Sequence, residues 1–424
     1  MNKFAFSSFA ILLAGAVAAK PSFVLPERLY ALPGRECNVY FSNVFGTVMP
    51  RAYAFEAKAQ VGEAQAERWH WTPKTEDAGR KERLVLSAWT DDGLVSAATA
   101  TVVVAGAARC KGRRTTVALF ADSLTNSGYQ DELFRVMRTD GFSGYTPVGS
   151  RKPMQPGCVP HDGFGGYCCK AFLTYYNVTE DELARVQDAA EREQLAALGV
   201  PVKVVKEWQR ELLKSPLIRL DGGRKIVDVP GWMRKANGGE PPDVVIVELG
   251  VNAVFGLEGS AEEMRREIRS RVIPEFEQFV AALRPHMPKA VIAITSCPLG
   301  CGQDGFGANY GATASVRQHR VTLFELNRAL ADYVRQQKDG PLALVPIAQA
   351  IDPVHGFLRA EMPANARTSE KVVRDRNALH PSTSGGAQLA DAIASWLACH
   401  WDAFADGFPA ETSELFKGIN SKEE

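Results

Sequence analysis

Ser123 and His380 are residue types that acyl-transfer chemistry uses. The apolar run TTVALFA is followed by Asp122 and then by Ser123, and a stretch with helical character comes next. His380 stands in the stretch NALHPSTSGG, just before the amphipathic run AQLADAIASWL. A serine hydroxyl is a weak nucleophile until a neighbouring base takes its proton, and histidine is the side chain most often used as that base. Serine is also common at helix starts, so Ser123 taken alone is better explained as a helix cap.

Two further stretches contain groups that can stabilise negative charge. HDGFGG places Gly165 and Gly166 in a loop, where a backbone N–H can approach a substrate closely. ELGVNAVFG places Asn252 at the end of another apolar run. Acyl transfer builds an oxyanion, which needs hydrogen-bond donors that are fixed in advance. The two stretches therefore supply candidate donors for the same reaction.

Serine, glycine, asparagine and histidine in this order resemble the four blocks of the SGNH (GDSL-like) hydrolase superfamily. The resemblance covers about residues 115–400, and His380-Pro381-Ser382 near the end of the chain is its most specific part. The stretch GFGANYG and the preceding strand-rich segment look like bacterial SGNH esterases with an N-terminal β-sandwich. The resemblance implies a serine esterase without a cofactor.

The resemblance also implies individual roles. Ser123 is the nucleophile and His380 the base. The implied oxyanion donors are the backbone N–H of Ser123, the backbone N–H of Gly166 and the side-chain amide of Asn252. Gly165 is the alternative to Gly166, because the sequence leaves the register of the loop open.

The chain departs from the family pattern at three positions. Ala121 replaces the motif glycine, which is tolerable where φ is negative, and Ala253 replaces an aspartate that often follows the asparagine. The third catalytic acid is expected three residues before the histidine, but that residue is Asn377. Asp375 lies five residues before His380 and is an equal candidate; Asn377 could instead orient the imidazole as a neutral group. A Ser-His dyad held by a backbone carbonyl is a third alternative.

Three other polar residues lie near these candidates in the sequence. His161 precedes the glycine loop, and it either lines the site or lies in a surface loop. His319 lies beside Arg317 and Arg320 at a helix start, a pattern that favours a solvated side chain. Asp122 is adjacent to the nucleophile, which favours a hydrogen-bonding residue at the strand end over a catalytic acid.

These residues require a scaffold in which strands end at one edge. After residue 115, buried-type apolar runs at 115–121, 243–250, 290–296 and 342–348 alternate with amphipathic helical stretches. This alternation predicts an α/β fold with a doubly wound parallel sheet and flanking helices, of the SGNH or flavodoxin-like kind. Ligands bind beyond the carboxyl ends of such strands, and Ser123 lies at such an end.

The segment before the sheet has a different periodicity. Residues 21–106 show short alternating runs and the turn signal TDDGL, which predict a small antiparallel β-sandwich. Trp69, Trp71 and Trp89 fit its core better than an exposed sugar-stacking face.

The chain therefore divides into successive segments. We expect a signal peptide over 1–19, the accessory β-sandwich over 20–106, the hydrolase domain over 115–402 and a tail over 403–424. The charged stretch at about 180–215 reads as a solvated helical insertion, with a lid over the site as the alternative.

The first residues have the features of a secretory signal. Lys3 is followed by a short apolar stretch and by small residues, which predicts cleavage near Ala18 or Ala19. The apolar stretch is too short for a membrane span, and a retained N-terminal anchor is the minority alternative. The predicted location is secreted or periplasmic.

Composition excludes several classes of function. Lys+Arg and Asp+Glu balance at 49 each, which argues against general binding to nucleic acid or to an anionic membrane. Cys297 and Cys301 have the spacing of half a zinc site, but no second ligand pair accompanies them. We therefore expect no metal, and either a local disulfide or buried free thiols.

The predicted function is hydrolysis of a small acyl ester, most plausibly acetyl, on a carbohydrate or another small ester substrate. Two other classes stay open: an acyltransferase that uses the same site, and a non-catalytic carbohydrate-binding protein with a decayed site. The missing acid at Asn377 is the feature that keeps the second open.

Overall fold

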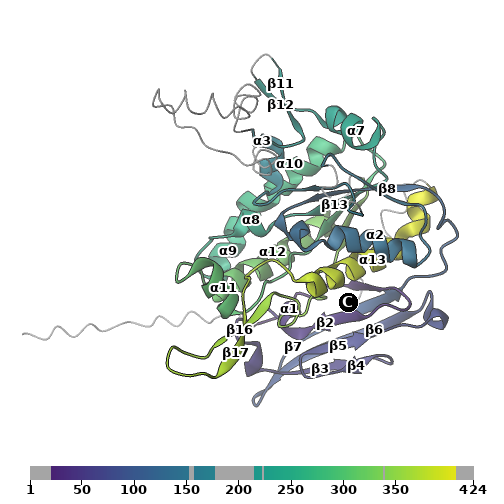
Figure 1. Ribbon diagram of the computed structural model, residues 1–424. Helices are drawn as coiled ribbons and strands as arrows, with labels where there is room; N and C mark the ends of the chain where they lie inside the picture. Colours follow the sequence, from purple (N-terminus) through teal and green to yellow (C-terminus); the bar gives the residue numbers. More distant parts are fainter. Residues whose placement is uncertain (1–20, 152–156, 177–213, 222–223, 338–339, 407–424) are drawn as a thin grey trace, which may run out of the picture.

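The architecture comes from a computed structural model of the chain (Figure 1). It describes residues 21–151, 157–176, 214–221, 224–337 and 340–406. The predicted signal peptide and the main part of the insertion at 180–215 lie outside the described residues. In the part described, no helix is both long and apolar enough to cross a membrane.

The N-terminal segment forms two small sheets that enclose a core. One sheet has the order β1 (Arg28–Ala31), β7 (Gly93–Val104), β6 (Lys81–Thr90) and β3 (Ala54–Lys58). The other has the order β2 (Cys37–Tyr40), β5 (Arg68–Trp71) and β4 (Glu63–Ala64). This agrees with the predicted sandwich except that β1 pairs with β7 in parallel.

The tryptophans of the sandwich serve its core. Trp69 and Trp71 are buried between the sheets, and the Trp69 indole donates to the Val61 carbonyl at 3.2 Å. Trp89 is half-buried, and its indole donates to the Ser87 hydroxyl at 2.9 Å. The expected core role is therefore confirmed for Trp69 and Trp71.

The second segment builds a parallel sheet, as the sequence predicts. β8 (Thr115–Ala121) pairs with β13 (Val244–Glu248), which pairs with β14 (Val291–Thr295) and then β15 (Leu342–Val345). β9 (Tyr145–Val148) and β10 (Asp162–Gly163) both pair with β8, at its two ends. Every residue of β8, β13 and β14 is buried, which explains why these strands read as continuous apolar runs.

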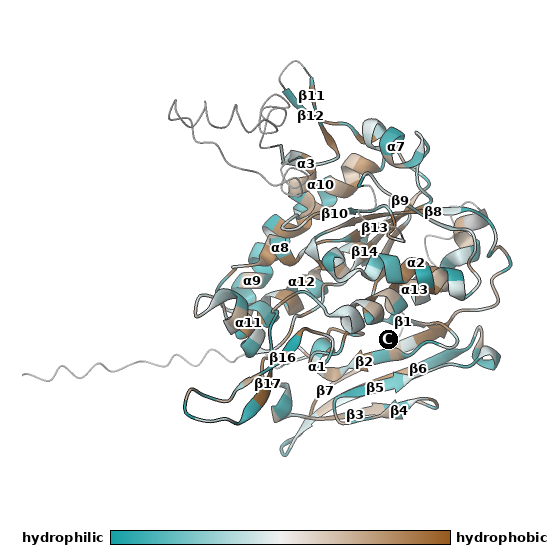
Figure 2. Ribbon diagram, viewed as in Figure 1, coloured by the Kyte–Doolittle hydropathy of each residue, from teal (hydrophilic) through white to brown (hydrophobic). Residues whose placement is uncertain are grey.

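Helices cover both faces of this sheet (Figures 1 and 2). α2 (Tyr129–Thr139) and α13 (Thr383–Asp406) pack on one face. The other face carries α12 (Val316–Gln336) and a helical run made of α9 (Ala261–Glu267), a π-helical turn (Ile268–Val272) and α10 (Ile273–Leu283). The predicted doubly wound α/β fold is confirmed.

The last helix runs past the predicted end of the hydrolase domain. α13 continues to Asp406, although the sequence placed the end of the domain at 402. Trp401 and Phe404 are buried in the same core as α2, so the apolar pattern carries the helix further. The rest of the predicted tail lies outside the described residues.

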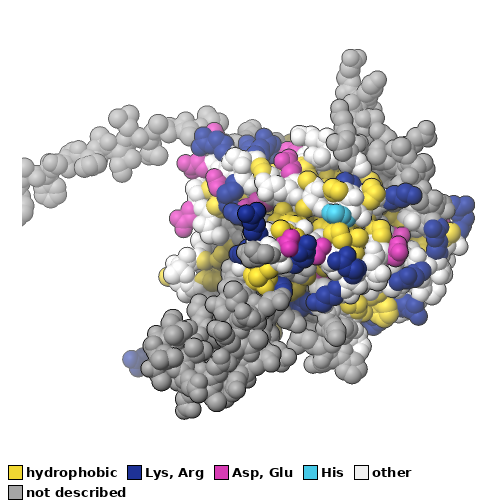
Figure 3. Space-filling model, turned by 90° about the horizontal axis from the view of Figure 1, so that it is seen from above, with side chains coloured by type: hydrophobic (Ala, Val, Ile, Leu, Met, Phe, Trp, Pro, Cys, Tyr) yellow, Lys and Arg dark blue, Asp and Glu magenta, His cyan; other side chains and the backbone are white. Residues whose placement is uncertain are grey.

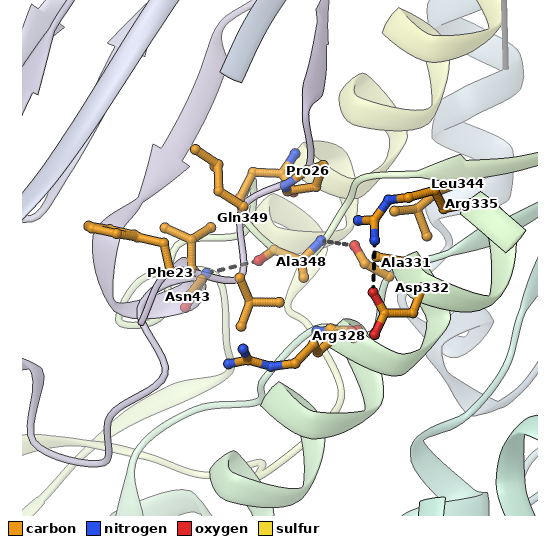
Figure 4. Close-up of a pocket in the computed structure, with 15 residues that line it drawn as sticks. Phe23, Pro26, Asn43, Arg328, Ala331, Asp332, Arg335, Leu344, Ala348 and Gln349 are labelled. Atoms are coloured by element: carbon orange, nitrogen blue, oxygen red, sulfur yellow. Dashed lines mark hydrogen bonds and ion pairs between the residues drawn. The ribbon is translucent and has the colours of Figure 1, made fainter. Parts of the chain in front are cut away.

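The sandwich is fixed to the α/β domain by buried polar contacts. The Asn43 amide, itself buried, donates to the carbonyls of Ala348 at 3.0 Å and Ile351 at 2.8 Å. Arg35 forms an ion pair with Asp140 at 3.0 Å. Figure 4 shows Asn43 beside a cavity of about 130 Å³ between the domains, which is below the ~300 Å³ at which ligand pockets begin. The interface therefore orients the two domains and is too tight to be a substrate site.

Surface charge follows the balanced composition. On the face shown in Figure 3, basic and acidic side chains lie interspersed among apolar and uncharged ones. That face offers no continuous patch of one sign.

Candidate active site

Ser123 lies where β8 passes into a short 3-10 helix, η3 (Ser123–Ser127). The helix is capped by Asp122, whose Oδ1 accepts from the Leu124 N–H at 2.9 Å. Ser123 is therefore the first helical residue and not the cap, so its hydroxyl is free for another partner. That partner is His380.

The His380 imidazole reaches the Ser123 hydroxyl. Nε2 of His380 lies 2.8 Å from Oγ of Ser123, across 257 residues of sequence. His380 is half-buried in the loop before α13, and burial lowers the pKa of its imidazole. A lowered pKa keeps the ring neutral at neutral pH, which is the form that accepts a proton. The pair has the geometry of a nucleophile and its general base.

Neither predicted third member contacts the imidazole within the described residues. The Asn377 side chain turns back on its own loop, where Oδ1 accepts from the backbone N–H of Leu379 at 3.2 Å and of His380 at 2.9 Å. Asp375 forms an ion pair with Arg359 at 3.3 Å, and its Oδ2 accepts from the Gly302 N–H, also at 3.3 Å. Asn377 shapes the histidine loop, and Asp375 is bound elsewhere, so the geometry is that of a Ser-His dyad.

The glycine loop closes against the serine. The Phe164 N–H donates to the Ala121 carbonyl at 3.0 Å, and the Tyr167 N–H closes a turn onto the Phe164 carbonyl at 3.1 Å. A methyl group at Gly165 would lie 3.7 Å from Cβ of Ser123, in van der Waals contact. Gly166 has a φ of 80° and open space around it, so this position favours glycine because of its backbone conformation.

Three backbone donors near the serine hydroxyl lack an acceptor within the described residues: the N–H groups of Ser123, Gly165 and Gly166. The first belongs to the first turn of η3, where no carbonyl of the helix can accept it. A Cβ atom at Gly165 would contact Ser123, whereas one at Gly166 would contact nothing within 4 Å. Both glycines stay candidates as oxyanion donors.

Asn252 ties the serine and glycine loops together. It belongs to α8 (Val251–Val254), directly after β13. Its amide nitrogen donates to Asp122 Oδ2 at 3.1 Å and to the Tyr167 carbonyl at 3.0 Å. An amide nitrogen carries two hydrogens, so both are engaged in this structure. Donation to an oxyanion therefore requires that one of these two bonds be shared or exchanged.

A buried pair of carboxyl groups behind the serine was not predicted from the sequence. Asp122 and Glu248 are each 1% exposed and have no ion-pair partner within the described residues. Burial raises the pKa of Asp122 to about 7, and burial together with the Asp122 charge raises the pKa of Glu248 well above its ordinary value. Tyr129 donates to Glu248 at 3.5 Å. Glu248 is the one charged residue in the run VVIVE, a signal that could have revealed the pair.

The remaining polar candidates are structural in this arrangement. His161 accepts from the Gly163 N–H at 3.0 Å, and burial lowers the pKa of its imidazole to about 4. The expectation that His319 is solvated is wrong, because the side chain is buried against Phe306 at the start of α12. Ala121 has an ordinary backbone: no residue other than glycine has a positive φ among those described.

The cysteines are free thiols throughout the described chain. Cys297 donates to the Leu249 carbonyl at 3.4 Å and Cys301 to the Gly302 carbonyl at 3.2 Å. Of the two alternatives from the sequence, the local disulfide is absent from this structure. Among the described residues, no cluster of histidine, cysteine or acidic side chains could hold a metal ion.

Comparisons with known proteins add structural likenesses. No protein-family model matches the chain, and no curated protein matches it. Solved structures similar to it include an acetyl esterase mutant with an acetate ion, at 16% identity and a TM-score of 0.38, covering 69% of this chain and 99% of that one. A carbohydrate esterase of family 3 from Talaromyces cellulolyticus has 15% identity and a TM-score of 0.38, covering 69% and 100%.

A carbohydrate acetylesterase from Sinorhizobium meliloti is also similar, at 14% identity and a TM-score of 0.30, covering 67% of this chain and 99% of that one. These proteins are esterases, as are members of the family that the sequence resembles. At this level of identity the likenesses assign no residue roles, so the site rests on its own geometry.

Proposed function

We propose that the protein is a serine esterase that removes a small acyl group, acetyl first among them, from a carbohydrate. The observation that carries this proposal is the 2.8 Å contact between Ser123 Oγ and His380 Nε2 at the carboxyl end of the parallel sheet. The carbohydrate part rests on the family resemblance and on the accessory sandwich. The proposal includes export from the cytoplasm, because the first residues have the pattern of a signal peptide.

The residues define a two-step reaction. His380 takes the Ser123 proton as the hydroxyl oxygen attacks the acyl carbon, which forms a tetrahedral intermediate with a negatively charged oxygen. The N–H groups at Ser123 and Gly165 or Gly166, with the Asn252 amide, are the donors proposed to stabilise that oxygen. His380 then gives its proton to the departing sugar oxygen, and an acyl-serine remains. Water, deprotonated by His380, attacks the acyl-serine and forms a second tetrahedral intermediate. The bond to Ser123 Oγ then breaks, His380 returns the proton to that oxygen, and the acid is released.

A dyad without an acid beside the histidine should work more slowly than a complete triad. Imidazolium formed during attack has no carboxylate beside it among the described residues, so its charge is stabilised less than in a complete triad. The Asn377 bonds to the loop N–H groups fix the position of His380 without adding charge. We therefore propose an enzyme with a modest turnover rate.

The decisive experiment compares wild type with Ser123→Ala on p-nitrophenyl acetate and on acetylated polysaccharide, with released acetate as the readout. We expect Ser123→Ala to abolish both activities while the melting temperature stays within a few degrees. Ser143→Ala, which changes an exposed serine, is the matched control and should behave as wild type.

Two results would contradict the proposal. Retention of most of the activity in Ser123→Ala would make the hydroxyl an ordinary polar group. Absence of activity in wild type, together with binding of the polysaccharide, would favour a carbohydrate-binding protein with a decayed site. An acyltransferase would instead yield an acylated sugar acceptor in place of free acetate.

A further inference from the structure

A pocket lies next to the segments that carry Asn252 and His380. It has a volume of about 490 Å³, within the ~300–1,000 Å³ typical of small-molecule sites. Its walls come from the segment after α8, from Phe306 of α11 (Gln303–Tyr310) and from the start of α12. None of the reacting groups belongs to this pocket, so it needs its own explanation.

Two observations place the pocket next to the segments that carry Asn252 and His380. Phe255 caps the C-terminus of α8, the four-residue helix that carries Asn252, and its N–H donates to the Val251 carbonyl at 2.9 Å. On the opposite side, a methyl group at Gly300 would lie 2.7 Å from the Ala378 carbonyl and 3.6 Å from Nε2 of His319. His319 therefore packs behind the loop that carries His380. The pocket is flanked by the asparagine helix and by the histidine loop.

The pocket offers an accessible aromatic wall. Phe255 is 37% exposed, and its ring lies 5.1 Å from the Tyr310 ring and 5.9 Å from the His319 ring, centroid to centroid. Phe306 packs behind it, 5.0 Å from His319. Aromatic faces of this kind bind the C–H face of a sugar ring as well as they bind other apolar surfaces.

Polar nitrogen atoms without partners accompany this wall. Nε2 of Gln318 and Nε2 of His319 are buried and have no hydrogen-bond partner within the described residues. A buried donor left unpaired costs ~1–3 kcal/mol, which a ligand with hydroxyl groups can recover. Gln318 is half-buried and lines the pocket, so rotation about its last torsion turns the amide toward a ligand.

The electrical balance of the pocket favours a neutral ligand. Burial lowers the pKa of His319 to about 4, so its ring is uncharged at neutral pH. The exposed charges on the lining are Arg317 and Glu258, of opposite sign. An anionic sugar or a phosphate gains nothing from this arrangement, and a bare acyl chain would leave the Gln318 amide unpaired.

We propose that this pocket is a subsite for a neutral pyranose ring of the acylated carbohydrate, with Phe255 as the stacking surface and Gln318 as a hydrogen-bond donor. The proposal rests on the proposed esterase function and names the part of the substrate that is recognised. It makes Phe255 a residue that selects the alcohol side of the ester.

The test compares two classes of substrate in the same variants. The ratio of kcat/KM for peracetylated glucose and xylose to kcat/KM for p-nitrophenyl acetate measures recognition of the sugar. We expect Phe255→Ala to lower this ratio about tenfold, mainly through KM, as for one lost aromatic contact. Gln318→Ala should lower it in the same direction. Leu94→Ala, which truncates a 52% exposed side chain on the sandwich, is the control and should leave the ratio unchanged.

Other outcomes separate this proposal from the esterase proposal. If wild type hydrolyses p-nitrophenyl acetate and the ratio stays within twofold in both variants, the subsite is refuted and the esterase stands. The variants could instead change the ratio of kcat/KM for p-nitrophenyl acetate to that for p-nitrophenyl octanoate, while the ratio for the acetylated sugars stays constant. That result would make the pocket a site for the acyl chain and would also overturn the proposal.

A binding readout covers the case in which no ester is turned over. Saturation-transfer NMR with methyl β-xyloside and methyl β-glucoside should detect binding to Ser123→Ala and a weaker signal in the double variant with Phe255→Ala. Equal signals in the two proteins, or none in either, would refute the subsite whether or not the protein is an esterase.

Discussion

Asp122 Oδ2 accepts a hydrogen bond from the Asn252 amide at 3.1 Å, and this contact joins the strand end that carries the serine to the next strand of the sheet. The other oxygen of Asp122 caps η3 through the Leu124 N–H. One carboxylate therefore sets both the helix that presents Ser123 and the amide proposed to stabilise the oxyanion. Asp122 is a positioning residue, because it acts through its neighbours.

Asp122→Asn should lower kcat by ~10²-fold and leave KM within about threefold. The asparagine side chain has one oxygen, whereas the two oxygens of Asp122 accept from the Leu124 N–H and from the Asn252 amide. One of these bonds is therefore lost, and the Asn252 amide is no longer fixed toward the oxyanion. Steady-state kinetics and the melting temperature are the measurements. Asp92→Asn, an exposed turn residue of the sandwich, is the control. A fall in kcat that parallels a large loss of melting temperature would make the role of Asp122 purely structural.

Asn252→Ala should lower kcat by ~10²–10³-fold with little change in KM, because an oxyanion contact strengthens as charge develops. The variant also loses the bond to the Tyr167 carbonyl, which holds the glycine loop. Asn252→Asp should be as slow as Asn252→Ala, because a carboxylate can donate neither to an oxyanion nor to the Tyr167 carbonyl. The melting temperatures of both variants report what the lost loop contact contributes to stability. An effect confined to KM in Asn252→Ala would make this residue an ordinary substrate contact.

The two sequence candidates for the third catalytic position, Asp375 and Asn377, should respond differently. Asp375→Asn should lower kcat by less than about threefold, far from the ~10⁴ loss that follows when a triad aspartate becomes an amide. Asn377→Ala should lower kcat about tenfold, because the loop before His380 loses the two bonds that the Asn377 side chain accepts from backbone N–H groups at 2.9 and 3.2 Å. Kinetics of both variants at saturating p-nitrophenyl acetate provide the measurement. A loss near 10⁴ in Asp375→Asn would restore Asp375 as the partner of His380.

The pH profile tests the same dyad from another side. Burial lowers the pKa of His380, so the acid limb of kcat/KM should lie below the ordinary histidine value of about 6.5, and activity should fall as pH drops through it. Asn377→Asp should move that limb upward, because a carboxylate near the loop favours the imidazolium. The profile of Asp375→Asn should coincide with wild type. An acid limb above 6.5 in wild type would indicate a carboxylate partner.

The order of strands and helices could be predicted because buried parallel strands and amphipathic helices leave strong periodic patterns. Leu323, Leu326 and Leu330 mark one face of α12, and all three are buried as their spacing predicts. Ser123, His380, Asn252 and the glycine loop could be proposed as one site because their order resembles that of the SGNH hydrolases and each lies in a loop beyond the sheet.

Contacts between side chains could not be predicted in the same way. Asp375 is close to His380 in sequence, but it ends strand β17 (Lys371–Asp375), which pairs with β16 (Arg359–Pro363). Arg359 of β16 lies directly opposite and forms an ion pair with Asp375, so the carboxylate does not face His380. His319 stands between two arginines, but the turn of α12 directs it into the protein and not into solvent. Charge patterns along the chain carry no information about a neighbour that comes from another element.

The carboxyl pair behind the serine makes stability depend on pH. A carboxyl whose pKa is raised on folding holds its proton in the folded state after the unfolded chain has lost it. Stability is then complete below the unfolded value near 4 and is lost as pH rises towards the folded value, about 7 for Asp122. The melting temperature of wild type should therefore fall between pH 5 and pH 8.5.

Glu248→Gln should reduce this fall. Glutamine keeps the size of the side chain and an oxygen that can accept from Tyr129. It removes a carboxyl whose pKa burial and the Asp122 charge raise, and with it that group's share of the fall. We expect the melting temperature to drop by ~2–4 °C less than in wild type between the two pH values. Glu361→Gln, an exposed residue of β16 paired with Lys371, is the matched control and should follow wild type. Equal drops in Glu248→Gln and wild type would show that Glu248 does not contribute to the fall, and that another group sets the alkaline limit of stability.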